Sequence, residues 1–332
     1  MVSSNEVAKR AGVSQSTVSR VLNGGQSVKP KTREKVLRVI EELQYRPNLI
    51  ARSLVTKSTK TIALVSGSVL NPFFAETTNS IIRYASQKGY NISVSFDEED
   101  NSNWLETAFG NSVDGILLSS LKLNDPVFED LKRSGIPYML FNRQPQHGGN
   151  YVVMDNFRAS ALITQHLLDL GHSRIAYISK NGHISTFLER YNGFVTTLQN
   201  EGKIVDPDLV YFLDSLEVGV EKATWKIMNS AKPPTAILCA NDAIALMCMD
   251  VLLSIGFKVP EDVNLAGIDN IKLASHGAIR LTSVGHEKFS MGEIAVESLI
   301  DMIEGRVSLS RPKQIVLKPE LVIRNTTCKT HT

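Results

Sequence analysis

Two kinds of hydrophobic pattern divide the chain at about residue 60. The N-terminal part carries apolar side chains at helical spacing in three short runs, whereas from Thr61 onward short, near-continuous apolar runs alternate with longer helical stretches. The first pattern predicts a small helical bundle and the second predicts strand–helix units. Between them, RPNLIARSLVTK at 46–57 has apolar residues at helical spacing, but a helix of this length is marginal alone in water.

The N-terminal pattern predicts three short helices joined by tight turns. Ser4 or Asn5 is expected to cap the first helix, Gly12 to end it, Ser14 to cap the second and Pro30 to begin the third. The side chains expected to form the core of this bundle are Val7, Ala8, Ala11, Val18, Val21, Leu22, Val36, Leu37, Ile40 and Leu43. Two helices joined by a glycine-containing turn, followed by a third, predict a helix-turn-helix domain.

The outward face of the second predicted helix differs from that of an ordinary exposed helix. Its side chains are short donors and acceptors plus one arginine, namely Gln15, Ser16, Thr17, Ser19 and Arg20. Such side chains can approach base edges closely, and arginine can bond to guanine O6 and N7 together. An ordinary exposed helix favours long Glu and Lys side chains. DNA binding is therefore the favoured interpretation, with a polar, solvated helix as the alternative.

Charge is unevenly distributed along the chain. Residues 1–60 contain 12 Lys and Arg against 4 Asp and Glu, a net charge of +8, whereas the whole chain has a net charge of +2. The remainder is therefore mildly acidic, at −6. A basic head on an acidic body predicts that the head, and not the body, meets a polyanion.

The head resembles the DNA-binding headpiece of the lactose-repressor/galactose-repressor (LacI) family. The resemblance rests on VAKRAGVSQSTVSRVLNG, KPKTREKV and YRPNLIARSL, which cover about 55 contiguous residues. It implies that Gln15, Ser16 and Arg20 read the major groove. It also implies that Thr17, Ser19, Asn23 and Tyr45 mainly contact phosphates and sugars. The full set of DNA-contacting residues predicted in this way is Ser14, Gln15, Ser16, Thr17, Ser19, Arg20, Asn23, Tyr45, Asn48, Ala51 and Leu54.

The short apolar segment after the headpiece resembles the hinge helix of the same family. Two such helices, one from each protomer, could bury apolar side chains against each other in the minor groove. Leu54 matches the leucine that wedges into a central base step, Ala51 is small enough for close approach, and Asn48 is expected to cap the helix. The alternative interpretation is an amphipathic linker docked on the body.

The body pattern predicts two doubly wound α/β lobes. Apolar runs suited to strands occur at 61–66, 91–96, 114–119, 137–141 and 151–154, and a second series occurs at 174–179, 209–213, 235–240 and 263–268. Apolar strands that alternate with helices predict parallel sheets covered on both faces. We expect the headpiece at 1–45, the hinge and linker at 46–60, and the body at 61–325. Lobe one is expected at about 61–155 and 286–312, and lobe two at about 156–285 and 313–325.

Polar residues that directly follow the predicted strands are the candidates for a small-molecule site. Ligands of such sheets bind outside the carboxyl ends of the strands, and two facing lobes form a cleft there. The motifs NPFFAE, MDN, GHSRIAYI, RYNGF, CAND and GIDN resemble, in this order, the periplasmic-binding-protein-like effector domain of the same family. The effector-binding residues that this resemblance implies are Phe73, Phe74, Asn142, Arg143, Arg190, Asn241 and Asp269.

The resemblance also suggests a role for each of these residues. Phe73 and Phe74 would pack on the effector and Arg143 would line the mouth of the cleft, while the remaining residues would hydrogen-bond the effector. Alternatives stay open for the polar residues, because Asn241 could cap the following helix, and Asp155 and Asn156 could serve the crossover between the lobes. Asn142 stands where the family often has Asp, which leaves the class of effector open.

Enzymatic motifs and metal-binding spacings are not found in the sequence. There is no GxSxG, P-loop, strand-associated GxGxxG or HExxH, and the seven histidines are scattered. The three cysteines show no metal spacing, and Cys239 and Cys248 lie in apolar runs. We expect no catalysis, cofactor or metal. No apolar leader segment or run of 18 apolar residues is found, which favours a cytoplasmic location.

Together these features predict a ligand-responsive regulator of transcription, most simply a repressor. Protein two-fold symmetry would match a near-palindromic operator, and the chain shows no C-terminal leucine heptads, so a homodimer is expected. Arg, Asp, Asn and aromatic residues favour a sugar or sugar acid as effector, and a purine-like ligand stays open. The alternative class is a cytoplasmic sugar-sensing module without a DNA role.

Overall fold

The chain folds into two compact units that divide between Thr59 and Lys60. The computed structural model describes residues 2–22, 28–45, 58–96, 113–180, 184–286, 290–308 and 311–330. The division lies close to the boundary that the change of hydrophobic pattern suggests. Each unit has a hydrophobic core of its own, so we describe the two separately, as the head and the body.

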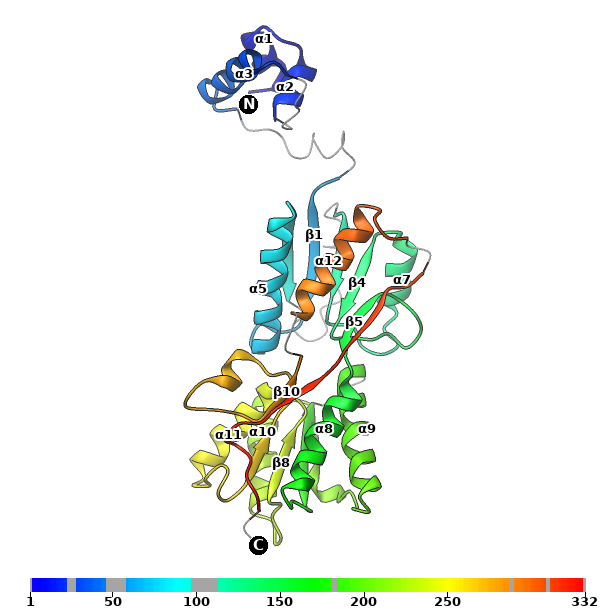
Figure 1. The fold of residues 1–332 in the computed structure, drawn as a ribbon, viewed down its shortest axis with the longest axis vertical. Helices are drawn as coiled ribbons and strands as arrows, with labels where there is room; N and C mark the ends of the chain where they lie inside the picture. The colour runs from blue at the N-terminus through cyan, green and yellow to red at the C-terminus, as the bar shows by residue number, and fades with distance from the viewer. Residues whose placement is uncertain are drawn as a thin grey trace. The chain divides into compact units, whose positions relative to one another are not determined.

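The head consists of three helices (Figure 1), which are α1 (Ser4–Ala11), α2 (Gln15–Leu22) and α3 (Pro30–Glu42). The N-cap of α1 is Ser3, whose Oγ accepts the Glu6 N–H at 3.3 Å while its own N–H donates to Glu6 Oε2 at 2.9 Å. The predicted caps Ser4 and Asn5 are therefore wrong by one or two positions. The reason is that Glu6, three residues after Ser3, completes a reciprocal capping pair.

The core of the head is small and mostly valine and alanine. The buried side chains are Val7, Ala8, Ala11, Val18, Val21, Val36 and Val39. Gly12 ends α1 with a φ of +64°, a conformation that glycine adopts without steric cost. The prediction that Leu37 belongs to this core is wrong, because its side chain is 48% exposed and Val39 occupies the inward position.

The first lobe of the body is built on a six-stranded parallel sheet with the order β11-β5-β4-β3-β1-β2. Its strands are β1 (Thr61–Ser66), β2 (Asn91–Phe96), β3 (Gly115–Leu118), β4 (Tyr138–Phe141), β5 (Tyr151–Met154) and β11 (Gln314–Leu317). Its helices are α5 (Pro72–Gln87), α7 (Val127–Ser134) and α12 (Met291–Ile303). Alternate side chains of β1 enter different cores, since Ile62 and Leu64 belong to one and Ala63 and Val65 to the other. Both faces of this sheet are therefore buried.

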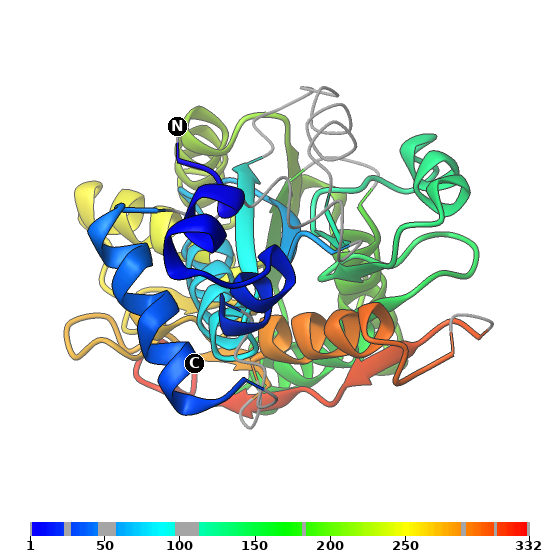
Figure 2. The same cartoon turned by 90° about the horizontal axis from the view of Figure 1, so that it is seen from above.

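Helices α5 and α12 lie side by side on one face of this sheet, as Figure 2 shows, and α7 covers the other face. Close approach of α12 is possible because two glycines leave room for neighbouring side chains. A Cβ at Gly115 would overlap Ile303 on α12, and a Cβ at Gly292 would overlap Ser80 and Thr77 on α5. The spacing of α12 from the sheet and from α5 is thus fixed by residues without side chains.

The second lobe is built on a four-stranded parallel sheet with the order β7-β6-β8-β9. Its strands are β6 (Ile175–Lys180), β7 (Val210–Leu213), β8 (Ala236–Cys239) and β9 (Asn264–Ala266). Its helices are α8 (Asn156–Asp169), α9 (Ser185–Asn200), η1 (Pro207–Leu209), α10 (Leu216–Met228), α11 (Asp242–Ser254) and η2 (Lys272–Ser275). These parallel strands fall within the apolar runs that predict them, apart from a shift of about one residue for β6.

The chain crosses between the lobes three times (Figure 1), after β5, between β10 (Ser283–Gly285) and α12, and between β11 and β12 (Glu320–Val322). Strands β10 and β12 form a small antiparallel sheet. The assignment of residues 313–325 to lobe two is wrong for β11, which pairs in parallel with β5 of lobe one. The free edge of β5 offers unpaired backbone groups, and β11 satisfies them.

The C-terminal segment after β12 belongs to the second lobe and extends past the expected end at 325. Leu265 N–H donates to Thr326 O at 2.9 Å, and Thr330 N–H donates to Leu170 O at 3.0 Å. The second lobe therefore reaches at least Thr330. Within the described parts of the chain, no helix combines the length and apolarity that a membrane span needs.

Helices α8 and α9 approach each other closely at Gly193. A Cβ built on Gly193 would overlap the carbonyl oxygen of Phe157 in α8. Backbone cannot move aside as a flexible side chain can, so only glycine fits at this contact. The spacing of the two helices matters for function because both carry residues of the polar cluster described below.

We expect Gly193→Ala to destabilise the body by about 2 kcal/mol, although Gly→Ala in a helix interior ordinarily stabilises by about 0.5–1 kcal/mol. The overlap with the Phe157 carbonyl reverses the sign. Urea unfolding followed by circular dichroism measures the effect. The control is Asn192→Ala, an exposed position on the same helix, which should be neutral or slightly stabilising. Equal stability of the two variants would contradict the close contact.

Candidate functional site

The face of α2 that is predicted to read DNA is open to solvent. The exposed residues of the predicted set on this helix are Gln15, Ser16, Ser19 and Arg20. Ser14, just before α2, accepts the N–H of Thr17 at 3.3 Å, and its hydroxyl lies 2.8 Å from that of Ser16. The start of α2 is therefore ordered by its own hydroxyls, and the exposed face consists of short polar side chains and one arginine.

The remaining predicted DNA contacts of the head have different surroundings. Tyr45 is half-buried and packs against the head core. Its predicted contact with the DNA backbone stays a prediction. The predicted residues that lie outside the part of the chain described by the structure are Asn23, Asn48, Ala51 and Leu54.

In the body, Arg190 is held by three acceptors. It lies on α9 and is 2% exposed, and its Nε donates to Asn156 Oδ1 at 2.8 Å. Its Nη1 donates to the carbonyl of Ala240 at 2.6 Å, and its Nη2 to Asp269 Oδ1 at 2.7 Å. A guanidinium carries five N–H groups, and these bonds use three of them. The structure thus brings together two of the predicted effector residues, Arg190 and Asp269, as a buried ion pair.

Asp269 follows β9 in a backbone conformation that is uncommon for a residue other than glycine. Its φ is +129° and that of the next residue, Asn270, is +51°. Residues held in such conformations cluster at binding sites, where surrounding contacts compensate the strain. Burial raises the pKa of the Asp269 carboxyl above its ordinary value, and the charge of Arg190 opposes that rise.

A second buried carboxyl, Asp242, lies next to this pair at the start of α11. Its Oδ1 accepts the hydroxyl of Ser283 at 2.6 Å, and its Oδ2 accepts the N–H of Ile271 at 3.0 Å. Burial raises its pKa to about 7, and the nearby charge of Asp269 adds to the rise. Asp242 therefore ties α11 to the loop that carries Asp269.

On the first-lobe side, Asn142 and Arg143 follow β4 and are buried. The carbonyl of Asn142 accepts the hydroxyl of Thr186, from the second lobe, at 2.6 Å, and Arg143 Nη1 at 2.6 Å. The Arg143 guanidinium also lies 5.8 Å from the centre of the Phe74 ring. In this structure the two residues therefore form part of the contact between the lobes.

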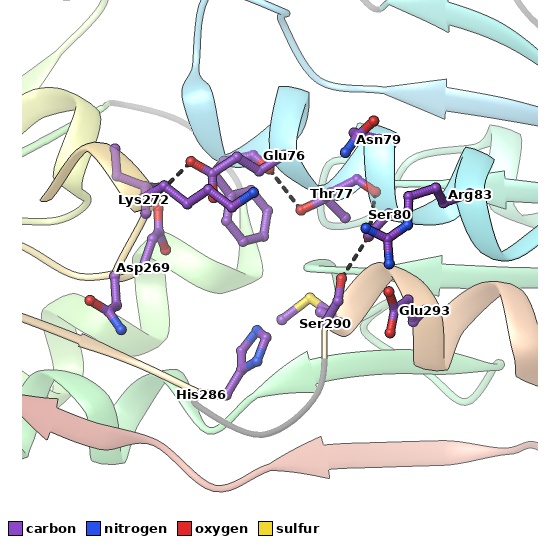
Figure 3. Close-up of a pocket in the computed structure, with 14 residues that line it drawn as sticks. Glu76, Thr77, Asn79, Ser80, Arg83, Asp269, Lys272, His286, Ser290 and Glu293 are labelled. Carbon is purple, nitrogen blue, oxygen red and sulfur yellow. Dashed lines mark hydrogen bonds between the residues drawn. The ribbon is translucent and has the colours of Figure 1, made fainter. Parts of the chain in front are cut away.

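A polar cavity of about 330 Å³ opens between the lobes (Figure 3). Its walls are one side of α5, the loop after β9, and the start of α12, which follows the second crossing. The residues that line it are Phe73, Glu76, Thr77, Asn79, Ser80, Arg83, Asp269, Asn270, Ile271, Lys272, His286, Ser290, Met291 and Glu293. Of the predicted effector residues, Phe73 and Asp269 line this cavity, whereas Phe74, Asn142, Arg143, Arg190 and Asn241 do not.

Two further hydrogen bonds cross between the lobes at different places. Glu76 Oε1 accepts the backbone N–H of Lys272 at 2.9 Å, beside the cavity (Figure 3). Ser185 Oγ accepts the backbone N–H of Gln144 at 3.0 Å. Sequence reasoning did not identify these contacts. Glu76 lies in the motif NPFFAE, but nothing in the spacing shows that it reaches a backbone group of the other lobe.

Several of the polar residues with open alternatives make structural hydrogen bonds. Asn241 caps α11, since its Oδ1 accepts the N–H of Ile244 at 2.8 Å. Asp155 caps α8 in the same way, by accepting the N–H of Arg158 at 2.9 Å. Asn156 orients Arg190 and donates to the carbonyl of Met154 at 2.9 Å. A role of Asn241 towards an effector stays a prediction.

The described residues contain no group of three or more His, Cys, Asp or Glu side chains placed to hold a metal ion. Cys239 and Cys248 are buried, as their apolar surroundings predict, and Cys328 is half-buried. The side chains that line the cavity offer hydrogen bonds and charge.

Comparison with known proteins shows similarity along the whole chain. Residues 5–48 match the family described as "Bacterial regulatory proteins, lacI family", and residues 164–327 match "Periplasmic binding protein-like domain". The HTH-type transcriptional regulator CelR of Thermobifida fusca is 34% identical, with 96% of each chain covered. DegA of Bacillus subtilis (strain 168), an HTH-type transcriptional regulator, is 33% identical, with 98% of each covered. An HTH-type transcriptional repressor PurR, from Aliivibrio fischeri (strain MJ11), is 31% identical, again with 98% of each covered.

Solved structures are similar in fold. The lac repressor dimer bound to operator and the anti-inducer ONPF superposes with a TM-score of 0.85 at 27% identity, covering 98% of this chain and 99% of that one. The complex of the transcriptional regulator CelR with cellobiose superposes with a TM-score of 0.73 at 31% identity, covering 98% and 100%. Both similarities include the head as well as the body.

We expect the stability of the body to fall as pH rises from about 4 to about 7, because the buried Asp242 keeps its proton over this range whereas the same group in the unfolded chain loses it. Its folded pKa of about 7 lies above its ordinary value of 3.8. The folded state therefore binds more protons than the unfolded state in this window, and up to about 1.4 kcal/mol is lost per pH unit. Above pH 7 this loss is complete.

The variant Asp242→Asn keeps the shape of the side chain and cannot titrate. Urea unfolding of both proteins between pH 4.5 and 8 measures the difference in their unfolding free energies. We expect the wild type to lose stability relative to the variant as pH rises. A difference that is constant with pH would show that Asp242 titrates normally.

Proposed function

The chain belongs to the lacI family of bacterial regulatory proteins and is a ligand-responsive, DNA-binding regulator of transcription; from this we propose that it is a repressor controlled by a carbohydrate bound between the lobes of its body. The observation that carries the ligand part of the proposal is the buried Arg190–Asp269 pair, with Asp269 also lining the cavity. Buried charged pairs with unused hydrogen-bonding capacity, beside a cavity, are typical of binding sites.

The charges of the cluster favour a neutral polyhydroxy ligand over a sugar acid. Asp269 already neutralises the guanidinium of Arg190, so a ligand carboxylate would be placed next to a carboxylate. A sugar hydroxyl in the cavity can donate to Asp269, whose charge the buried Arg190 already balances. The solved complex of the relative CelR contains cellobiose, a neutral sugar, which supports the same choice.

Coupling to DNA would proceed through the contacts between the lobes. A ligand that changes the lobe orientation alters bonds such as that between Glu76 and Lys272, and so moves Lys60, where the body begins. Lys60 is fixed to the first lobe because its N–H donates to Asp114 at 3.0 Å and its Nζ to Tyr90 Oη at 2.9 Å. Differential binding of this kind typically changes DNA affinity by about 1–3 kcal/mol.

The assembly and its location follow from the DNA part of the proposal. Two protomers would present two copies of α2 to the half-sites of a near-palindromic operator, as the operator complex of the lac repressor dimer suggests. The protein would act in the cytoplasm, where such operators lie. It would not be an enzyme, in line with relatives that are regulators.

We expect Arg20→Ala to relax base discrimination at one operator position by about 1–3 kcal/mol, because an exposed arginine on α2 can bond guanine at two atoms. Binding selection on a library of palindromes, with half-sites randomised, measures the preference. Arg38→Ala, which removes the same charge from an exposed position of α3, is the matched control. It should weaken binding to all sequences alike. An unchanged preference in Arg20→Ala would remove Arg20 from base reading.

Ligand and operator should affect each other by the same factor, since binding free energies are reciprocally linked. A thermal-shift screen over neutral sugars, sugar acids, sugar phosphates and nucleobases identifies the ligand, because a molecule that binds only the folded state raises the unfolding temperature. Calorimetry with and without operator then measures the factor. Asp269→Asn should abolish the shift, and because the variant leaves Arg190 without its charged partner, its operator binding is the check that it is folded.

A ligand that binds with equal affinity in the presence and absence of operator would overturn the coupling. A protein that binds sugar but shows no sequence-specific, salt-dependent DNA binding would instead be a sensing module.

A further inference from the structure

One side chain of the predicted DNA-reading face is tied to another helix. The Nε2 group of Gln15, the first residue of α2, donates to the Oγ of Ser4, the first residue of α1, at 2.9 Å. Eleven residues separate the two, so this bond joins the starts of two helices rather than closing a local turn. It is the feature of the recognition face that sequence reasoning did not predict.

Ser4 is a fixed point because α1 is anchored at both ends. Ser3 and Glu6 cap its N-terminus reciprocally, and Gly12 ends it in the left-handed conformation. Val7 and Ala8, within the same helix, are buried in the head core. Since Ser3 acts as the cap, the hydroxyl of Ser4 is not needed for the helix end and can accept from Gln15.

Gln15, in contrast, is exposed and would be mobile without this bond. A free glutamine side chain has three rotatable bonds, and ordering it at an interface costs conformational entropy. The bond to Ser4 restricts the side chain before DNA is present. In this bond the amide is held against α1, with Nε2 donating to the Ser4 hydroxyl and Oε1 facing away from it.

The remaining hydrogen-bonding groups of Gln15 match one base. A primary amide has two N–H groups and one carbonyl oxygen. With one N–H bound to Ser4, the other N–H and Oε1 remain, and these can bond adenine at N7 and N6 together. Guanine presents two acceptors, N7 and O6, and would leave Oε1 facing an acceptor.

We propose that Ser4 is a positioning residue for sequence readout, which orients the amide of Gln15 so that α2 selects adenine at one position of each half-site. This rests on the proposed function, in which α2 enters the major groove. Ser4 itself need not touch DNA, because its effect passes through Gln15.

The test uses the full-length protein and a library of palindromic duplexes with randomised half-sites. Four variants are compared with the wild type: Gln15→Ala, Ser4→Ala, the double variant, and Ser4→Thr, which keeps the hydroxyl. Affinities for the selected palindrome, and for versions changed at single base pairs, give the preference at each position. Affinity for a random duplex and the thermal unfolding temperature report on non-specific binding and on folding.

We expect the wild type to prefer adenine at one position by about tenfold or more, and Gln15→Ala to lose that preference. Ser4→Ala should lower it by about threefold to tenfold, the effect of one hydrogen bond. Its affinity for random duplex should be unchanged, and Ser4→Thr should restore the preference. In the double variant, the loss of Ser4 should add nothing to the loss of Gln15, because both act through one contact.

Other outcomes overturn the proposal in distinguishable ways. A full preference in Ser4→Ala, or additive losses in the double variant, would show that Ser4 does not act through Gln15, while DNA reading by α2 stands. No change in Gln15→Ala would remove Gln15 itself as a reader. Absence of any sequence-selective binding by the wild type would overturn the proposed function as a whole.

Discussion

The body of this protein is organised around the buried ion pair between Arg190 and Asp269. Two unpaired charges buried at this depth would destabilise the fold, because the free energy lost when an ion leaves water is recovered only through charged or hydrogen-bonding partners. The pair is therefore surrounded by groups that complete its hydrogen bonding, namely Asn156 and the carbonyl of Ala240. These come from α8 and the end of β8, so the pair fixes elements from several parts of the second lobe.

The same constraint extends to the residues around the pair. Asp242 binds the loop before η2 through Ile271 and the strand β10 through Ser283. It also lies close enough to Asp269 for the charge of that residue to raise the pKa of Asp242. A ligand that meets Asp269 acts on a network that reaches α9, α11 and the second crossing between the lobes. Removing one charged member leaves the others incompletely paired, which makes the cluster sensitive to substitution.

Sequence reasoning predicted the architecture, and two of its candidate effector residues, Phe73 and Asp269, line the cavity, but it did not predict their partners. The change from helical spacing to apolar strand runs located the division between head and body, and the parallel sheets follow from β1 to β9. It missed β11, a run of four residues of which two are exposed and two half-buried, and it placed Ser4 or Asn5 rather than Ser3 at the cap of α1. Glu76 and Lys272 are distant in sequence, and Glu76 bonds a backbone N–H, which every residue except proline has. The pattern of side chains therefore could not predict this contact. The resemblance suggested Arg190 and Asp269 as separate ligand contacts, whereas in the structure they bind each other.

The three chain crossings between the lobes have a mechanical consequence. Each crossing is a short covalent tether, and the small sheet of β10 and β12 joins two of them by backbone hydrogen bonds. Sliding of one lobe over the other would stretch several tethers at once, whereas rotation about an axis through them stretches none. Motion of one lobe relative to the other would also act on the bond from Lys272 to Glu76, which lies at the same cavity as His286 and Ser290 of the second crossing.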